Sequence, residues 1–389
     1  MNRHKIALLN NIADAGITAL GKNCITSDSI ENAVGVLVRS ANMHELEFPQ
    51  SLRAIARAGA GTNNIPLERA TENGIAVFNT PGANANAVKE IVLCAMLIAA
   101  RNIIGGVQWV KEISTSPTLT KDVEEGKKAF AGNELSGKVL GIIGLGAIGS
   151  RVAHAALALG MQVIGFDPYL TAQMEERLPA KMKYTAKIEK IFAQSDYITL
   201  HVPFTAETAN LIDADVLTAA KPGAVVMNFA RDGLIDEQAI EKALNSGIIS
   251  QYITDLPNTR NINMKGCIAI PHLGASTAES EENCAIMAAQ ELVDYLENGN
   301  ITNSVNLPNC SLGPLKDPAR ICVMHKNVPN MLAAITSVLG THNININDMS
   351  HRSRGNIAYV LLDVDESADE TITEKISQID GVVRVRVLQ

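Results

Sequence analysis

A glycine motif in the middle of the chain constrains the fold more than any other feature. Residues 144–149 read Gly-Leu-Gly-Ala-Ile-Gly, directly after the apolar run 139–143 and before a stretch of small residues at 150–159. A strand, a glycine turn and a helix in this order form the phosphate-binding turn of dinucleotide folds. The first glycine permits the tight turn, the second admits a pyrophosphate, and the third lets helix and strand pack closely. The motif therefore predicts a doubly wound, nucleotide-binding α/β domain.

The residue that ends the next apolar run indicates which dinucleotide binds. Asp167 lies 18 residues after Gly149, close to the ~20 expected for the acid that binds the ribose hydroxyls. Its charge would repel a 2′-phosphate, and residues 168–170 supply no cation to accept one. We therefore predict NAD rather than NADP; a glycine turn without any ligand is the alternative. The predicted contacts in the turn are Gly144, Gly146, Ala147, Ile148 and Gly149.

Short, continuous apolar runs alternate with helical patterns through the first three quarters of the chain, as in parallel sheets covered by helices on both faces. Two long helical runs, 84–104 and 277–297, flank one complete block of strands and helices. We predict an α/β protein in which a doubly wound Rossmann NAD-binding domain is inserted into a flavodoxin-like substrate domain, with a ligand cleft between them. The predicted ranges are 1–94 and 276–306 for the substrate domain, 95–275 for the NAD-binding domain, 307–318 for a Pro/Gly-rich linker and 319–389 for a βαββαβ module.

Composition excludes several classes of protein. Among 389 residues, 33 Lys+Arg against 41 Asp+Glu give a net charge of −8, and aromatics are 4%, which argues against a nucleic-acid or anionic-membrane binder. The longest apolar run, 91–100, is ten residues where a membrane helix needs about 20. The first ten residues carry too short an apolar stretch for a signal peptide. Six cysteines lack C-x-x-C spacing and most sit in apolar stretches, which indicates small core residues in a reducing compartment. Together these features predict a soluble, cytoplasmic protein, and we expect no metal.

Two polar residues at predicted strand ends could carry chemistry. Arg231 follows the apolar run 224–228, where its planar fork of donors could clamp a carboxylate and polarise a carbonyl. His272 follows the run 267–270, and histidine is the natural acid/base at neutral pH. A surface salt bridge for Arg231 and a structural role for His272 are the alternatives, and His201 has the same unaided claim as His272.

A second anion site is predicted in the first domain. Arg57 precedes the glycines Gly59 and Gly61, whose backbone N–H groups could face an anion. Arg39 and Ser40 end a neighbouring predicted strand. Two arginines on one rim favour a doubly anionic substrate; ordinary loop glycines and surface arginines are the alternative.

These four motifs, in this order and at these strand ends, resemble the D-isomer-specific 2-hydroxyacid dehydrogenase family over about residues 1–305, and 319–389 resembles an ACT domain. An ACT domain together with Val38-Arg39-Ser40 is similar to the family members that oxidise 3-phosphoglycerate to 3-phosphohydroxypyruvate with NAD in serine biosynthesis. The resemblance implies an NAD-dependent dehydrogenase, a homodimer or homotetramer, and possible feedback by serine. A purely structural dimerisation module is the alternative for the ACT domain.

The resemblance also implies roles for matching positions. Arg231 orients the substrate carboxylate and polarises the C2 oxygen, His272 takes the C2 hydroxyl proton, and Asp255 faces the nicotinamide or its ribose. Further cofactor positions are Val202, Pro203, Thr208, Ala230, Gly274 and Ala275. Substrate positions are Arg39, Ser40, Arg57, Gly59 and Ala60, with Lys127 or Lys128 as helpers, and the serine effector positions are His325, Asn327 and Asn345.

One departure from the family pattern concerns the histidine. The family supplies a glutamate between the positions of Asp255 and His272, but residues 256–271 contain no carboxylate. Asp255 as a substitute partner is the less favoured option. Alternatives for the whole chain are a glyoxylate/hydroxypyruvate reductase, another 2-hydroxyacid dehydrogenase, or an NAD-sensing binding protein similar to the C-terminal binding protein corepressors.

Overall fold

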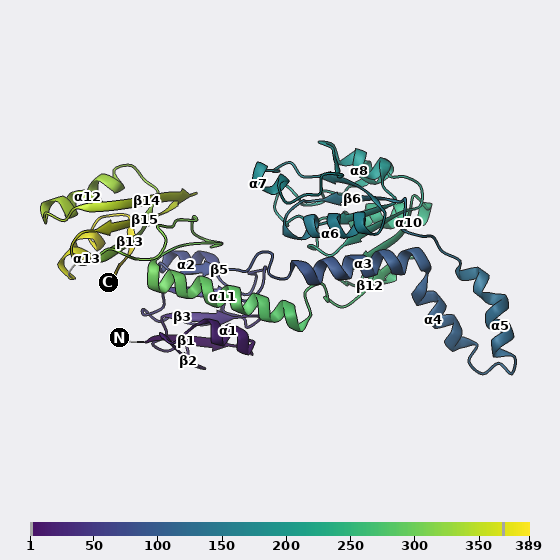
Figure 1. Cartoon of the computed structure of the whole chain (residues 1–389), viewed down its shortest axis with the longest axis horizontal. Coiled ribbons are helices and arrows are strands. Elements are labelled where there is room, and N and C mark those ends of the chain that lie inside the picture. The colour runs from purple at the N-terminus through teal and green to yellow at the C-terminus, as the bar shows by residue number, and fades with distance from the viewer. Residues whose placement is uncertain (1–2, 368–369) are drawn as a thin grey trace. The chain divides into compact units, whose positions relative to one another are not determined.

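The computed structural model describes residues 3–367 and 370–389. Its contacts divide the chain into two compact units, one formed by Met1–Asn84 with Ala278–Gln389 and the other by Ala85–Thr277 (Figure 1). The second unit is therefore inserted into the first along the chain. The domain boundaries set from the sequence at residues 94, 275 and 306 stay predictions.

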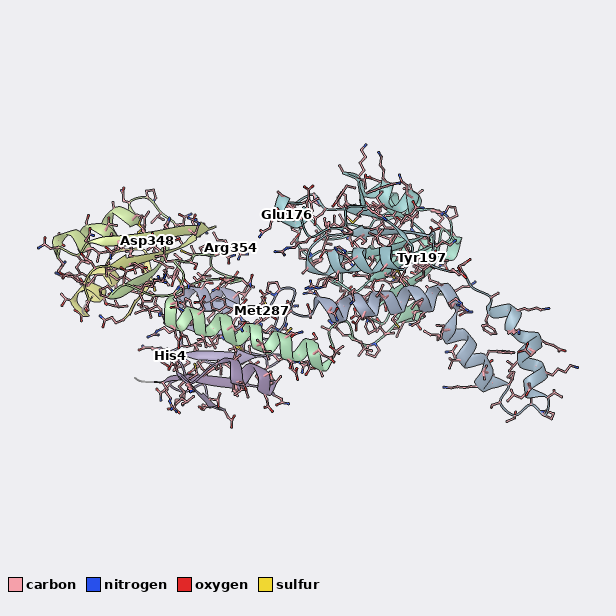
Figure 2. The ribbon with its side chains drawn as sticks, in the orientation of Figure 1. His4, Glu176, Tyr197, Met287, Asp348 and Arg354 are labelled. Atoms are coloured by element: carbon pink, nitrogen blue, oxygen red, sulfur yellow. The ribbon has the colours of Figure 1, made fainter. Side chains whose placement is uncertain are left out.

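The Ala85–Thr277 unit is built on a parallel sheet of seven strands in the order β12-β11-β10-β9-β6-β7-β8, which contains the order of a Rossmann fold and confirms that prediction. One face of the sheet packs against α3 and α6 and the other against α8, α9 and α10. Tyr197 of β9 is buried in this unit (Figure 2). The strands are β6 (Val139–Ile143), β7 (Gln162–Phe166), β8 (Lys183–Tyr184), β9 (Tyr197–Leu200), β10 (Ala224–Asn228), β11 (Ile249–Thr254) and β12 (Cys267–Ala269). The helices are α3 (Ala85–Arg101), α4 (Ile103–Glu112), α5 (Leu119–Gly126), η1 (Lys127–Phe130), α6 (Ala147–Ala158), α7 (Ala172–Glu175), α8 (Ile188–Gln194), α9 (Ala214–Thr218), α10 (Glu237–Ser246) and η2 (Asn261–Asn263).

The helix predicted over 84–104 is wrong at its end. Asn102 takes the left-handed conformation with φ of 45°, so α3 stops at Arg101 and α4 leaves at an angle of 58°. Asparagine tolerates this conformation because its side chain can form hydrogen bonds with the nearby backbone. The break was not predicted because the apolar pattern continues across Asn102. Helices α4 and α5 then form an arm that projects from the sheet (Figure 1). Among the described residues no single helix is long and apolar enough to cross a membrane. Helices α3 and α4 taken together have the length and apolar composition of a membrane span, but they are bent by 58°.

A parallel sheet of five strands in the order β2-β1-β3-β4-β5 forms the first part of the other unit. This is the flavodoxin-like order, as predicted. The long helix α11 packs against α1 and against β3, β4 and β5. The elements are β1 (His4–Leu9), α1 (Asp14–Ala19), β2 (Cys24–Ser27), β3 (Gly35–Val38), β4 (Ala54–Arg57), α2 (Leu67–Glu72), β5 (Ala76–Phe78) and α11 (Ala278–Asn298).

The C-terminal part has the predicted βαββαβ order and an antiparallel sheet, β14-β15-β13-β16. One face of this sheet packs on its own two helices. The other face joins the core of the five-stranded sheet, where Cys322, Met324 and Tyr359 meet Tyr295 of α11. The elements are β13 (Ala319–Lys326), α12 (Met331–Thr341), β14 (Ile346–Arg354), β15 (Ile357–Val364), α13 (Glu370–Ser377) and β16 (Val382–Leu388).

Arginines complete this shared core. The last carbonyls of a helix have no partner within the helix, and cations satisfy them well. Arg386 donates to the carbonyls of Tyr295 and Leu296 at the end of α11. Arg320, fully buried, pairs with Asp363 at 2.5 and 2.7 Å and donates to the Asn298 carbonyl at 2.7 Å. The βαββαβ module is thus bound to α11 by buried polar contacts as well as by apolar packing.

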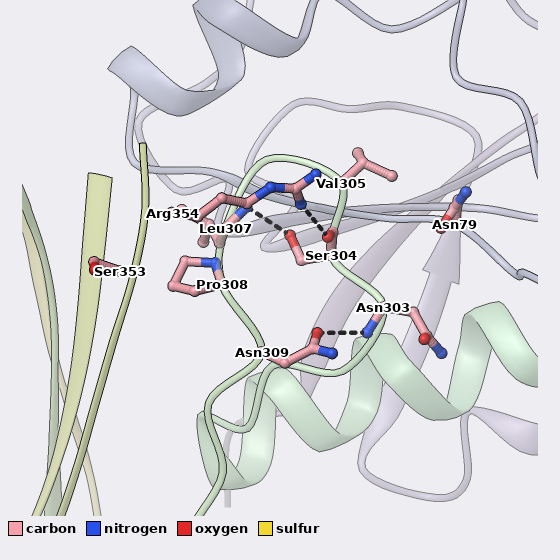
Figure 3. Close-up of a pocket in the computed structure, with 9 residues that line it drawn as sticks. All are labelled: Asn79, Asn303, Ser304, Val305, Leu307, Pro308, Asn309, Ser353 and Arg354. Carbon is pink, nitrogen blue, oxygen red and sulfur yellow. Dashed lines mark hydrogen bonds between the residues drawn. The ribbon is translucent and has the colours of Figure 1, made fainter. Parts of the chain in front are cut away.

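The segment predicted as a linker is packed rather than free. Leu307 and Cys310 are buried, and the Cys310 thiol lies 3.4 Å from the Ser350 hydroxyl of β14. Arg354 of the same strand donates to the Ser304 carbonyl at 3.1 Å, and Asn309 accepts the Asn303 N–H at 3.0 Å. A shallow cavity of about 390 Å³ lies beside this segment (Figure 3). It is lined by Asn79, Asn303, Ser304, Val305, Leu307, Pro308, Asn309, Ser353 and Arg354.

Candidate active site

The three glycines of the turn differ in what surrounds them. Gly144 has φ of +91°, and a Cβ there would lie 2.5 Å from the His201 carbonyl oxygen. A Cβ on Gly149 would lie 2.0 Å from the Gly144 carbonyl oxygen, so the helix–strand contact requires glycine. A Cβ on Gly146 would meet nothing within 4 Å, because this glycine, at the N-cap of α6, faces open space. The open position at a helix N-terminus fits a dinucleotide pyrophosphate.

Asp167 follows β7 and is fixed beside this turn. Its carboxylate accepts the N–H of Leu145 and the N–H of Tyr169, each at 2.9 Å. Two arginines near the turn were not predicted as site residues. Arg151 lies on α6 and Arg177 follows α7, so they are far apart in sequence and neither belongs to a motif. Arg151 and Arg177 contribute to a cavity of about 430 Å³ that is lined by Leu145, Gly146, Ala147, Ser150, Arg151, His154, Met174 and Arg177.

The segment after β9 lies against the same turn. The Val202 side chain would touch a Cβ on Gly144, and Thr208 donates to the Pro203 carbonyl at 2.7 Å. His201 in this segment bonds Thr199 through Nε2 at 3.1 Å, while its Nδ1 is buried without a partner among the described residues. Burial lowers the pKa of His201 to about 3, so the ring stays neutral near pH 7. His201 therefore does not exchange a proton near neutral pH, which removes it as a candidate for the catalytic acid/base.

Residues at the ends of three adjacent strands come together. Arg231 follows β10, Asp255 follows β11 and His272 follows β12, and these strands are neighbours in the parallel sheet. Asp255 is 1% exposed and accepts the Gly274 N–H at 2.8 Å. Burial raises the pKa of the Asp255 carboxyl, and the Gly274 N–H, the His272 ring and the Arg231 guanidinium oppose that rise. The His272 and Arg231 side chains thus both lie within electrostatic reach of Asp255.

The backbone around Arg231 is held by the strand before it. Asn228 donates to the Arg231 carbonyl at 2.9 Å and accepts the Ala230 N–H at 3.0 Å. Thr254, at the end of β11, donates to the Asn228 carbonyl at 3.0 Å. Neither Asn228 nor Thr254 was predicted as a site residue, since both read simply as the polar ends of apolar runs.

Within the other unit, the structure brings Arg39 and Arg57 together at the ends of β3 and β4. The Arg57 Nε donates to the Arg39 carbonyl at 3.0 Å, and a Cβ on Gly59 would lie 2.2 Å from the Arg57 guanidinium. Arg39 forms an ion pair with Glu281 of α11 at 2.6 Å. Glu281 was missed because 242 residues separate it from Arg39 in sequence.

Polar side chains support the loop and the turn beside these arginines. Asn10 accepts the Ser40 N–H at 3.0 Å, and Asn79 donates to the Ala60 carbonyl at 2.6 Å. Lys127, suggested as a helper, lies in the short helix η1 of the 85–277 unit and is paired with Glu124 of α5, and its helper role stays a prediction. Lys128 follows it in the same short helix.

The predicted effector residues lie at opposite ends of one sheet. His325 and Asn327 are at the end of β13, whereas Asn345 lies just before the start of β14. Val364 of β15 pairs with both Ile346, the first residue of β14, and Ala319, the first residue of β13, so Asn345 lies near the start of β13. Six residues of strand, about 20 Å, separate the two ends. One chain therefore does not bring the three together. The His325 ring instead stacks on His351, with centroids 5.4 Å apart.

Two family models match the chain. The one described as "D-isomer specific 2-hydroxyacid dehydrogenase, NAD binding domain" matches residues 93–274, and the ACT domain matches residues 321–381. The fold, the glycine turn and these matches define a protein with the NAD-binding domain of the 2-hydroxyacid dehydrogenase family, followed by an ACT domain.

Curated relatives agree with this class. A D-3-phosphoglycerate dehydrogenase of Haemophilus influenzae is 31% identical over 98% of this chain and 94% of its own length. One of Methanocaldococcus jannaschii is 34% identical over 84% of this chain and 63% of its own length, so the chain spans less than two thirds of that relative. A hydroxypyruvate reductase of Thermotoga maritima is 38% identical over 64% of this chain and 80% of its length.

A solved structure gives the same result. The NAD+-bound 3-phosphoglycerate dehydrogenase of Entamoeba histolytica is 29% identical, covers 78% of this chain and 99% of its own, and has a TM-score of 0.62. The chain belongs to the D-isomer specific 2-hydroxyacid dehydrogenase family.

Proposed function

We propose that the protein oxidises 3-phosphoglycerate to 3-phosphohydroxypyruvate with NAD, a step of serine biosynthesis. The observation that carries the chemistry is the set of Arg231, Asp255 and His272 at the ends of three adjacent strands of an NAD-binding sheet. The names of the Haemophilus and Methanocaldococcus relatives support the choice of substrate.

Different residues of the 85–277 unit bind the substrate, transfer the proton and bind the cofactor. Bound NAD supplies the hydride acceptor. Arg231 holds the substrate carboxylate and polarises the C2 oxygen through its paired donors. His272 accepts the C2 hydroxyl proton as general base. Gly146 and Asp167 are positioned for the pyrophosphate and the ribose of the cofactor.

Arg39 and Arg57 supply the charge for the phosphate. A dianionic phosphate favours two guanidinium groups over a neutral pocket. Glu281 reduces the net charge of this rim from +2 to +1, because it is paired with Arg39. This ion pair is the observation that favours the second candidate, an enzyme acting on an unphosphorylated acid such as hydroxypyruvate.

An absorbance assay at 340 nm tests the function. The purified protein is given NAD with 3-phosphoglycerate, D-glycerate and other 2-hydroxy acids, and NADH with hydroxypyruvate in the reverse direction. We expect kcat/KM to be highest for 3-phosphoglycerate. Higher kcat/KM for an unphosphorylated acid would select the second candidate, and NAD binding without turnover of any acid would select an NAD-sensing protein.

We also propose that the protein is a homodimer or homotetramer. Helix α4 has no buried residue and exposes Ile103, Val107 and Val110, a face that a second copy would cover. The separation of His325 from Asn345 also means that a serine site using both needs a second ACT domain. Light scattering gives the mass: we expect a multiple of 41.5 kDa, and a Val107→Asp variant of lower mass.

A further inference from the structure

The family's glutamate partner of the catalytic histidine has no counterpart between Asp255 and His272. Two glutamates of α10 lie near that segment, but both are already bonded. Glu237 accepts an N–H of Asn258, and Glu241 pairs with Arg260 at 2.6 Å. Neither carboxylate is therefore available to the His272 ring.

Asp255 is a further carboxylate near this segment. Its Oδ2 accepts the N–H of Gly274, two residues beyond His272, which places the carboxyl group beside the histidine segment. Its Oδ1 is buried and has no hydrogen-bond partner among the described residues. A buried, unpartnered carboxylate oxygen is costly and is found where a partner is expected.

We propose that Asp255 replaces the missing glutamate as the positioning residue of His272, holding the ring in place and stabilising the imidazolium that forms when the ring accepts the C2 hydroxyl proton. This inference rests on the proposed function for the identity of the proton donor. The proton passes to the ring, and Asp255 stays ionised throughout.

The charges around the pair support this role. His272 and Arg231 are the two charged groups that act on Asp255, and both favour its ionised form against the effect of burial. Asp232, next to Arg231, accepts the Gly233 N–H at 2.9 Å. A negative charge close to an imidazole favours the protonated ring by ~1 pH unit or more.

The test is the Asp255→Asn variant, which keeps the shape and an oxygen for the Gly274 N–H but removes the charge. We expect the acid limb of the kcat/KM profile for oxidation to move to lower pH by about one unit, with kcat reduced at least tenfold. The His272 ring signal in the NMR spectrum of histidine-labelled protein, assigned with His272→Gln, is expected to titrate at lower pH by the same amount. Asp255→Glu is expected to restore part of both shifts.

Asp215→Asn is the matched control, since Asp215 is exposed on α9 and the change in charge is the same. It should leave both midpoints unchanged. If Asp255→Asn weakens NAD binding in calorimetry but moves neither midpoint, Asp255 serves the cofactor alone and the inference is overturned. The NMR titration needs no substrate, so an unmoved signal contradicts this inference even where 3-phosphoglycerate proves not to be the substrate.

Discussion

At the scale of single residues, the strand-end position decides what a side chain can do. His201 and His272 both follow apolar strands, yet burial keeps His201 neutral while His272 is exposed beside Asp255. The same residue type thus has a structural role at one strand end and an expected catalytic role at another.

Replacing His272 by alanine should remove the general base and leave the cofactor turn intact. We expect kcat to fall by about 10²- to 10⁴-fold, the usual contribution of a positioned acid or base. The dissociation constant for NAD, measured by calorimetry, should stay within twofold of the wild type. Full activity in the variant would exclude His272 from the mechanism.

Glu291 of α11 should make stability depend on pH. Burial raises the pKa of Glu291 to about 7, while Asn303 donates to one of its oxygens at 2.7 Å. Because the folded protein holds this proton more tightly than the unfolded chain, stability contributed by the neutral form is present below pH 4.5 and is lost as pH rises through 7. The Glu291→Gln variant removes that loss.

We therefore expect the unfolding free energy of Glu291→Gln, relative to the wild type, to increase by about 3 kcal/mol from pH 4.5 to pH 8. Urea unfolding at the two pH values measures it. The exposed neighbour Glu282, changed to Gln, should show no such trend. A difference independent of pH would mean that Glu291 has the same pKa in the folded protein as in the unfolded chain.

At the scale of elements, two glycines of the turn have different roles, one in binding NAD and one in folding. Gly146→Ala places a methyl group in open space where the pyrophosphate is expected, so NAD affinity should fall at least tenfold with little loss of stability. Gly149→Ala forces a methyl group against the Gly144 carbonyl, so stability should fall by about 1–3 kcal/mol. Calorimetry and urea unfolding distinguish the two. Equal NAD affinity in Gly146→Ala would place the cofactor elsewhere.

Helix α11 controls the charge of the arginine rim through Glu281. Exposed ion pairs contribute up to about 1 kcal/mol, so Glu281→Gln should lower KM for 3-phosphoglycerate by up to fivefold. The KM for an acid without phosphate should not change. Glu279→Gln, one of the acids in the first turn of the same helix, is the matched control. A raised KM would show that Glu281 positions Arg39 for the substrate instead of competing for it.

Sequence patterns predicted elements well where packing is local. The strands Val139–Ile143 and Ala224–Asn228 are observed with the predicted bounds, because buried parallel strands read as continuous apolar runs. The edge strands β2 and β8 were missed, since half-exposed edge strands lack that signal. The pair Arg39–Glu281 and the buried pair Arg320–Asp363 join distant residues, which no local pattern reveals.

At the scale of the whole molecule, the shared core makes a specific prediction about cooperativity. The ACT domain has its own helix-covered core, but its second face lies in one cluster with α11 and the five-stranded sheet. Residues that share a core unfold together more readily than residues joined by a tether. We expect the ACT sheet and the flavodoxin-like sheet to open in one step.

Arg320→Ala tests this cooperativity, because it leaves Asp363 buried without its cation and should cost about 3–5 kcal/mol. Hydrogen exchange read by mass spectrometry should show faster exchange in β13 and in α11 together, with β6 of the other unit unaffected. Arg352→Ala is the control, since Arg352 is exposed and donates to the carbonyl of the preceding residue, His351. Faster exchange confined to the ACT strands would show that the ACT domain opens independently, and the arginine contacts at the end of α11 would then not couple the two sheets.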